Sequence, residues 1–100
     1  MNLDTTTQKI RTLFANAAGF SDTLTFDFGA DGIVSVNGKT HPPEVSNDNI
    51  DSDCTISITL EDFISIIEGA LDPQMAFMSG KLSVEGNMGI AMNLASVLKA

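Results

Sequence analysis

The stretch CTISITLEDFISIIEGAL, residues 54–71, changes its hydrophobic period part-way along. Its first half alternates, which predicts a strand whose inward side chains are Cys54, Ile56, Ile58 and Leu60. Its second half has a helical repeat, which predicts an amphipathic helix with the apolar stripe Leu60, Phe63, Ile64, Ile67 and Leu71. Thr59 and Asp62 have the spacing of a capping box at the start of this helix. A strand that leads directly into a helix is therefore expected over these residues.

Upstream, the pattern predicts a helix followed by a hairpin. Residues 4–18 form a helix with Asp4 or Thr5 as the N-cap and Gly19 as the stop. Its apolar stripe is Ile10, Leu13, Phe14, Ala17 and Ala18. Residues 23–37 form two alternating strands around the turn GADG, and the inward side chains of the first are Leu24, Phe26 and Phe28. Pro42 and Pro43 then limit the chain to an edge strand or a loop, and NDNIDSD, residues 47–53, is expected to be a solvated connection.

Downstream, Pro73 is expected to end the helix that starts at Leu60, and QMAFMSG is expected to be a short apolar loop. KLSVEG alternates again, which predicts a strand with Leu82 and Val84 inward, and Asn87 can cap a last helix over residues 88–99. Each predicted strand has one polar face, so the sheet should be largely antiparallel and covered by helices on one side. We therefore expect one α+β domain over residues 1–100.

The chain is strongly acidic, with 13 acidic and 5 basic residues and a formal net charge of −8. This charge repels nucleic acid and anionic membrane surfaces, so neither is expected as a partner. No apolar run approaches the roughly 18 residues of a membrane span, which predicts no stable membrane insertion. The N-terminal residues do not resemble a secretory signal and the single cysteine cannot form an internal disulfide, so a cytoplasmic location is expected.

The sequence does not assemble the residues of an active site. His41 lies beside two prolines, which favours a surface position, and Cys54 falls on the inward side of a strand as a small hydrophobic residue. NDNIDSD lacks the glycine and the terminal glutamate of a calcium loop. GNMG, residues 86–89, lacks the paired glycines of a dinucleotide site. We therefore expect no catalysis, no metal and no cofactor.

The last predicted helix is apolar nearly all round, so more than one of its faces must be kept from water. Apart from the first residue, every methionine lies in or beside residues 76–92: Met75, Met78, Met88 and Met92. Methionine is unbranched and polarizable, so it suits a cavity whose contents vary, although it can equally fill an irregular core. The second face of the helix needs a protein partner, an oligomer interface or an apolar ligand.

The run DCTISITLEDFISIIEGALDPQMAFMSGKLSVEGNMGIAMNLASVL, residues 53–98, resembles the sterol carrier protein 2 (SCP-2) domain family. The resemblance is carried by DCTI before a helix, DPQ after it, AFMSGKL at the start of a strand and GNMGIAM at the start of the last helix. It implies a five-stranded sheet with helices on one face that enclose an apolar tunnel. It also implies non-catalytic binding and transfer of fatty acids, fatty acyl-CoA, sterols or phospholipids.

The resemblance further implies which residues contact the lipid, with Gln74 at a polar headgroup. They are Phe63, Ile64, Ile67, Gln74, Met75, Phe77, Met78, Leu82, Val84, Met88, Ile90, Met92 and Leu94. Lipid-transfer members of the family are often basic, whereas this chain is acidic, which favours a free acid or a neutral lipid over acyl-CoA. The alternative is an interaction domain whose apolar last helix docks on another protein or forms a weak homodimer.

Overall fold

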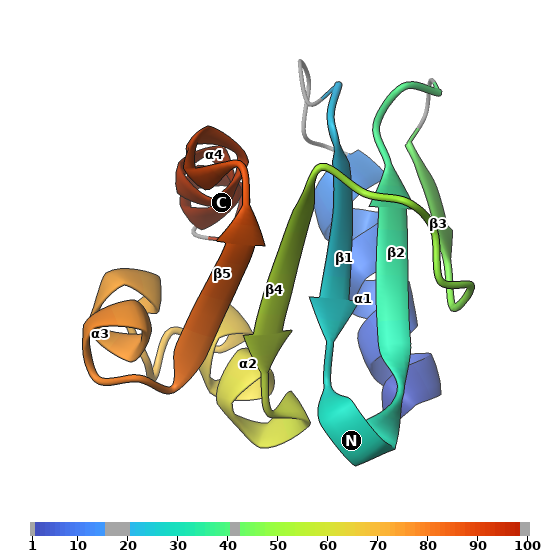
Figure 1. The fold of residues 1–100 in the computed structure, drawn as a ribbon. Helices are drawn as coiled ribbons and strands as arrows, with labels where there is room; N and C mark the ends of the chain where they lie inside the picture. Colours follow the sequence, from blue (N-terminus) through green and yellow to red (C-terminus); the bar gives the residue numbers. More distant parts are fainter. Residues whose placement is uncertain (1, 16–20, 41–42, 99–100) are drawn as a thin grey trace.

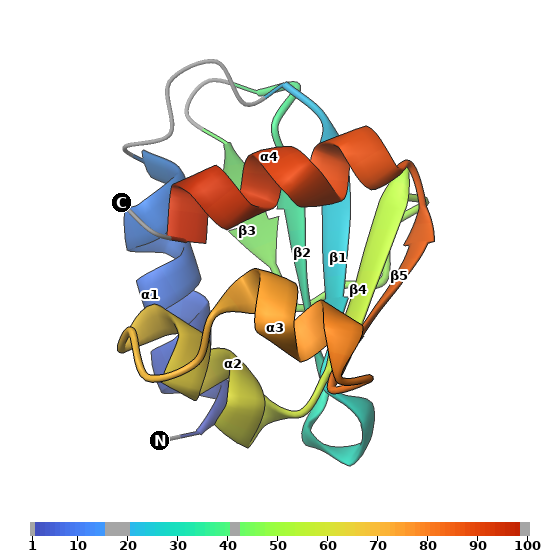
Figure 2. The same cartoon turned by 90° about the vertical axis from the view of Figure 1, so that its left-hand side faces the viewer.

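The computed structural model describes residues 2–15, 21–40 and 43–98, with side chains described up to Asn93. In this part of the chain a five-stranded sheet is covered by helices on one face (Figures 1 and 2). The strands are β1 (Thr23–Asp27), β2 (Ile33–Asn37), β3 (Glu44–Ser46), β4 (Cys54–Ile58) and β5 (Leu82–Gly86). The helices are α1 (Leu3–Ala15), α2 (Leu60–Ile67), α3 (Pro73–Met78) and α4 (Met88–Leu98), with a 3₁₀ turn, η1, at Gly29–Asp31. The predicted α+β fold class is confirmed.

The strands follow the order β3-β2-β1-β4-β5. The expected hairpin is present, because β1 pairs antiparallel with β2 and Leu24 lies opposite Val36. β3 and β5 also pair antiparallel, each at one edge of the sheet. β1 and β4 are parallel, with Leu24 beside Cys54. The sheet is therefore mixed and largely antiparallel, as expected, with one parallel pair at its centre.

The hydrophobic core lies between the sheet and the helices and is built around aromatic rings. The ring of Phe63, from α2, lies 5.0 Å from that of Phe26 and 5.3 Å from that of Phe28, measured between centroids. Phe14, from α1, makes an edge contact with Phe26. The inward residues predicted for β1 and β4 are all buried, because strand alternation places them on the helix-covered face.

The other face of the sheet is only partly exposed to solvent, whereas strand alternation predicted a solvent-exposed polar face. The segment between β3 and β4 crosses this face in front of β2 and β1 (Figure 1). The Ser35 hydroxyl donates to the carbonyl of Asp48 at 2.6 Å, and the Thr25 hydroxyl donates to Ser52 Oγ at 2.9 Å. Thr25 and Ser35 are buried as a result. Residues 47–53 are themselves exposed or partly exposed, so the prediction of a solvated connection is confirmed, but the hydroxyls of the sheet beneath them are buried and hydrogen-bonded.

Helix α1 begins earlier than its sequence pattern predicted. The Asn2 side chain accepts a hydrogen bond from the backbone N–H of Thr5 at 2.9 Å, so Asn2 is the N-cap and neither Asp4 nor Thr5 takes that role. Asn, Asp and Thr are all common at the N-cap, so the sequence pattern alone could not identify which residue takes this position. The predicted stripe residues Ala17 and Ala18 and the stop at Gly19 lie outside the described residues.

The chain between α2 and β5 also differs from the sequence-based expectation. The predicted cap of α2 is confirmed, because the N–H of Asp62 donates to Thr59 Oγ1 at 3.2 Å. However, α2 ends at Ile67, and Gly69 follows it with a φ of 80°. Pro73 starts the next helix, α3, instead of ending α2, because its fixed φ suits the first position of a helix. The segment expected to be a loop is thus mostly helical.

Candidate functional site

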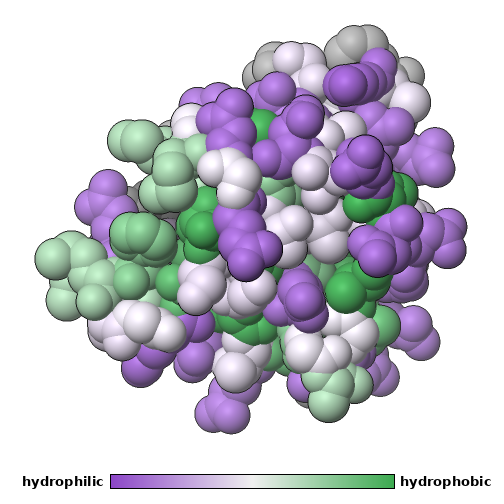
Figure 3. Space-filling view, viewed as in Figure 1, coloured by the Kyte–Doolittle hydropathy of each residue, from purple (hydrophilic) through white to green (hydrophobic). Residues whose placement is uncertain are grey.

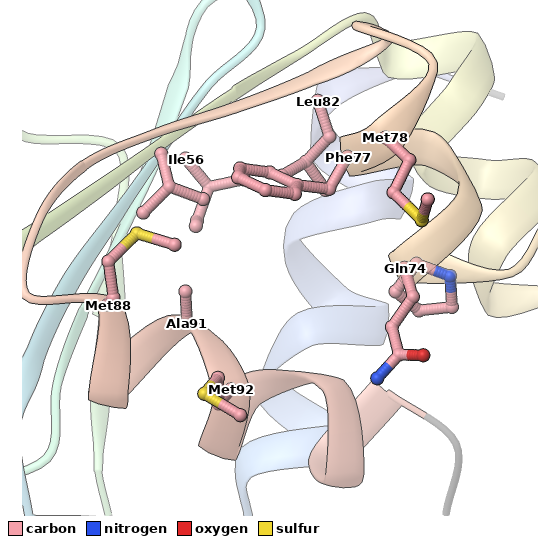
Figure 4. Close-up of a pocket in the computed structure, with 10 residues that line it drawn as sticks. Ile56, Gln74, Phe77, Met78, Leu82, Met88, Ala91 and Met92 are labelled. Carbon is pink, nitrogen blue, oxygen red and sulfur yellow. The ribbon is translucent and has the colours of Figure 1, made fainter.

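A hollow of about 370 Å³ lies between α3, β5 and the first turns of α4, with β4 beneath it (Figure 4). We call it the apolar hollow. It is lined by Ile56, Pro73, Gln74, Phe77, Met78, Leu82, Val84, Met88, Ala91 and Met92. Among these residues only Gln74 has a polar side chain.

Helix α3 forms one wall of the apolar hollow. Asp72 caps it, with a carboxylate oxygen that accepts from the N–H of Gln74 at 2.8 Å. Ala76 is buried toward the core, which turns the side chains of Phe77 and Met78 toward the hollow and its mouth. In Figure 4 the ring of Phe77 extends across the hollow toward Ile56. The cap at Asp72 and the burial of Ala76 thus fix the position of α3 and of the wall that it forms.

The floor and the opposite wall come from β5 and α4. The antiparallel register pairs Ile56 with Val84 and Ile58 with Leu82, so these side chains share one face of the sheet. The predicted cap of α4 is confirmed, because the N–H of Gly89 donates to Asn87 Oδ1 at 2.8 Å. Met88, Ala91 and Met92 then follow at the spacing of one helical face, and Figure 4 shows Ala91 pointing into the hollow.

Methionine side chains surround the mouth of the apolar hollow and are exposed. Met78 is 80% exposed and Met92 is 70% exposed, and Met75, which does not line the hollow, is 59% exposed. In Figure 3 the pale green side chains on the left lie over α3, β5 and α4. The hollow is open to solvent within the described residues, so the enclosed tunnel implied by the resemblance stays a prediction.

The predicted lipid contacts divide into several groups in the structure. Those that line the apolar hollow are Gln74, Phe77, Met78, Leu82, Val84, Met88 and Met92. Phe63 and Ile90 are buried in the core, and Ile64 and Ile67 are partly buried against it. Met75 is exposed outside the hollow, and the side chain of Leu94 lies outside the described part.

Sequence reasoning missed Ile56, Pro73 and Ala91 as lining residues. Ala91 follows Met88 by three positions, a spacing that could have indicated it. Ile56 lies on a predicted strand, but its place under the hollow depends on the pairing of β4 with β5, which local sequence does not encode. Pro73 was interpreted as the end of one helix when it begins another.

The described residues hold no cluster of metal ligands, and the thiol of Cys54 is buried. They contain no cluster of three or more His, Cys, Asp or Glu side chains that could hold a metal ion. Cys54 is buried in the core, and burial raises the pKa of its thiol, which makes the thiolate less available. His41 lies outside the described residues. In the described part no helix is both long and apolar enough to cross a membrane.

Residues 6–99 match the SCP-2 sterol transfer family. The chain belongs to this family. The family match extends well beyond the run at residues 53–98 that carried the resemblance, so the family prediction is confirmed. Binding and transfer of lipids is the general function that membership of the SCP-2 family supports.

Individual relatives agree with the SCP-2 assignment. The chain is 43% identical over 51 residues to sterol carrier protein 2 of Homo sapiens, which covers 51% of this chain and only 9% of that protein. The solution structure of sterol carrier protein domain 2 of Helicoverpa armigera has a TM-score of 0.71 at 26% identity, covering 91% of this chain and 84% of that one. Palmitated SCP2L2 of Aedes aegypti has a TM-score of 0.78 at 22% identity and covers 100% and 96% of the two chains.

Proposed function

We propose that this SCP-2 family chain binds the apolar part of a lipid in the apolar hollow and transfers the lipid without altering it. The observation that carries this proposal is a concave site of about 370 Å³ whose described lining is apolar apart from Gln74. Burying an alkyl chain contributes about 0.8 kcal/mol per CH₂. A ten-carbon chain therefore gains roughly 8 kcal/mol before the cost of association, which is enough for binding without strong polar contacts.

The lining also indicates how selective this site is. Its methionine side chains can repack around ligands of different shape, and one methylene more or less changes binding by only about 1–3 kcal/mol. Fatty acids, fatty acyl-CoA and sterols all carry an apolar part that the hollow could receive. The chain would act as a carrier, and the ligand should be recovered chemically unchanged.

Filling the apolar hollow tests this proposal. Ala91→Phe should place a ring in the space that the lipid would occupy and lower its affinity at least about tenfold. Ala30→Phe is the matched control, because Ala30 is exposed in the 3₁₀ turn and does not line the hollow. Binding is measured by displacement of a fluorescent apolar probe from delipidated protein. Equal affinity in both variants would place lipid binding elsewhere in the molecule.

A second candidate function is self-association through α4. Met88 and Met92 on this helix are exposed, and a second copy of the chain could cover them. Analytical ultracentrifugation over a wide concentration range separates the two functions. A carrier that needs no partner stays monomeric on dilution, whereas the interaction function predicts a dimer that Met92→Lys dissociates.

A further inference from the structure

Three methionines of the apolar hollow line its space and are at the same time accessible from solvent. Met78 lies on α3, whereas Met88 and Met92 lie on α4, on the other side of the hollow (Figure 4). Met88 is about half exposed, and the other two are exposed over most of their surface. A small solute in water can therefore reach these side chains.

Solvent access matters because the thioether of methionine reacts with peroxides. A lone pair on the sulfur attacks one oxygen of hydrogen peroxide, so an S–O bond forms and the O–O bond breaks. The departing hydroxide takes the proton of the transferred oxygen and leaves as water, so the sulfur loses two electrons and the peroxide is reduced. The products are methionine sulfoxide and water, and the step requires no further protein group.

The other kind of sulfur in the chain is protected from this reaction. Cys54 is the single cysteine of the sequence, and its side chain is buried in the core. Burial raises the pKa of its thiol, which lowers the fraction of the reactive thiolate. We therefore expect peroxide to act on exposed thioethers before it acts on this thiol.

A sulfoxide in the lining would oppose lipid binding. Apart from Gln74, the described lining residues are apolar. The sulfoxide oxygen is a hydrogen-bond acceptor that water solvates, and an alkyl chain that displaces this water offers no hydrogen bond in return. Oxidation would thus lower the affinity for a lipid without removing any residue from the hollow.

We propose that Met78, Met88 and Met92 are oxidation sites, and that their conversion to sulfoxides by a peroxide makes the apolar hollow release its lipid. The inference rests on the proposed function, because it assumes that the hollow receives the lipid. It adds a form of regulation, in which the oxidation state of three side chains sets the affinity of the site. Methionine sulfoxide reductases reverse this oxidation, so the loss of affinity should be reversible.

The experiment treats the delipidated chain with hydrogen peroxide and measures the oxidation of each methionine by peptide mass spectrometry. Met75 lies on the same helix as Met78 and is exposed, but it does not line the hollow, so it reports the peroxide dose. At a dose that oxidises Met75, we expect Met78 and Met92 to be oxidised to a similar extent. The affinity for the neutral fluorescent probe N-phenyl-1-naphthylamine should then fall about tenfold, and methionine sulfoxide reductases should restore it.

Leucine variants separate the lining sulfurs from the sulfur outside the hollow. Leucine replaces methionine with little change of volume and has no sulfur to oxidise. A triple variant with Met78→Leu, Met88→Leu and Met92→Leu keeps Met75 oxidisable. Peroxide should change the affinity of this variant less than about twofold relative to its own untreated value. Met75→Leu is the matched control and should lose affinity on treatment as the parent chain does.

A second pair of variants imitates oxidation without an oxidant. Glutamine has nearly the length of methionine and carries a polar oxygen near the end of its side chain. Met78→Gln should weaken binding of the probe about three- to tenfold, whereas Met75→Gln should change it less than about twofold. Thermal unfolding midpoints equal to that of the parent chain would show that both variants fold normally.

The outcomes distinguish this inference from the proposed function. If the oxidised parent chain binds the probe as tightly as the untreated chain, the inference is overturned and the proposed function stands. The same conclusion follows if the triple leucine variant loses affinity as the parent chain does, or if Met78→Gln and Met75→Gln have equal effects. If the untreated parent chain does not bind the probe, both proposals fail together.

Discussion

At the scale of single residues, Phe63 should contribute to the stability of the fold but not to lipid binding. The family resemblance implied a lipid contact, but its ring is buried against Phe26 and Phe28 and does not line the apolar hollow. Phe63→Leu should lower the free energy of unfolding by about 1–2 kcal/mol through lost packing. Lipid affinity of the folded protein should change less than about twofold. Urea unfolding measures the change in stability, and probe displacement measures the change in lipid affinity. A large loss of affinity at unchanged stability would mean that Phe63 contacts the lipid.

Gly86 is a second residue whose role follows from its surroundings. It has a φ of 98°, and an added Cβ would collide with the backbone carbonyl oxygen of Asp53. Gly86→Ala should therefore lower the free energy of unfolding by roughly 2–4 kcal/mol. Gly80 has a similar φ of 81° but open space around it, so Gly80→Ala should cost only about 1 kcal/mol. Equal losses in urea unfolding would mean that the contact with Asp53 does not matter.

At the scale of elements, two helix caps of similar chemistry should differ in their effect on binding. Asp72 caps α3, which supplies Gln74, Phe77 and Met78 to the apolar hollow. Thr59 caps α2, none of whose residues lines it. Asp72→Ala and Thr59→Ala should each lower the free energy of unfolding by about 1 kcal/mol. Only Asp72→Ala should weaken binding of a neutral lipid, and calorimetric titration of both variants checks this difference.

The prediction of elements from sequence failed where the signal was short. The apolar stripes of α1 and α2 and the alternation of β1 and β4 are periodic over enough residues to identify each type of structure. Helix α3 has only six residues, too few for a helical period to stand out. Its start is marked by Asp72-Pro73, a combination that is compatible both with the end of one helix and with the beginning of another.

At the scale of the whole molecule, the acidic charge should govern how the chain approaches membranes. A formal net charge of −8 repels a bilayer that contains anionic lipid. Transfer of a neutral pyrene-labelled lipid from phosphatidylcholine vesicles should therefore be faster than from vesicles that also contain phosphatidylserine. The difference should disappear near 1 M salt, where the Debye length falls to about 3 Å. A difference that salt does not change would point to lipid packing instead of charge.

Local sequence by itself determined the unit of β4 and α2, the β1–β2 hairpin, the caps at Thr59 and Asn87 and the membership of the SCP-2 family. These features depend on residues that are near one another in the chain, so periodicity, capping and motif order are sufficient to predict them. Only the tertiary structure decided the parallel pairing of β1 with β4, the burial of Thr25 and Ser35 and the place of Ile56 beneath the apolar hollow. Each of these depends on strand register or on packing between segments far apart in the chain, which no local pattern specifies. The walls of the apolar hollow come from the consecutive elements α3, β5 and α4, but the way these elements pack against one another is likewise set by tertiary contacts.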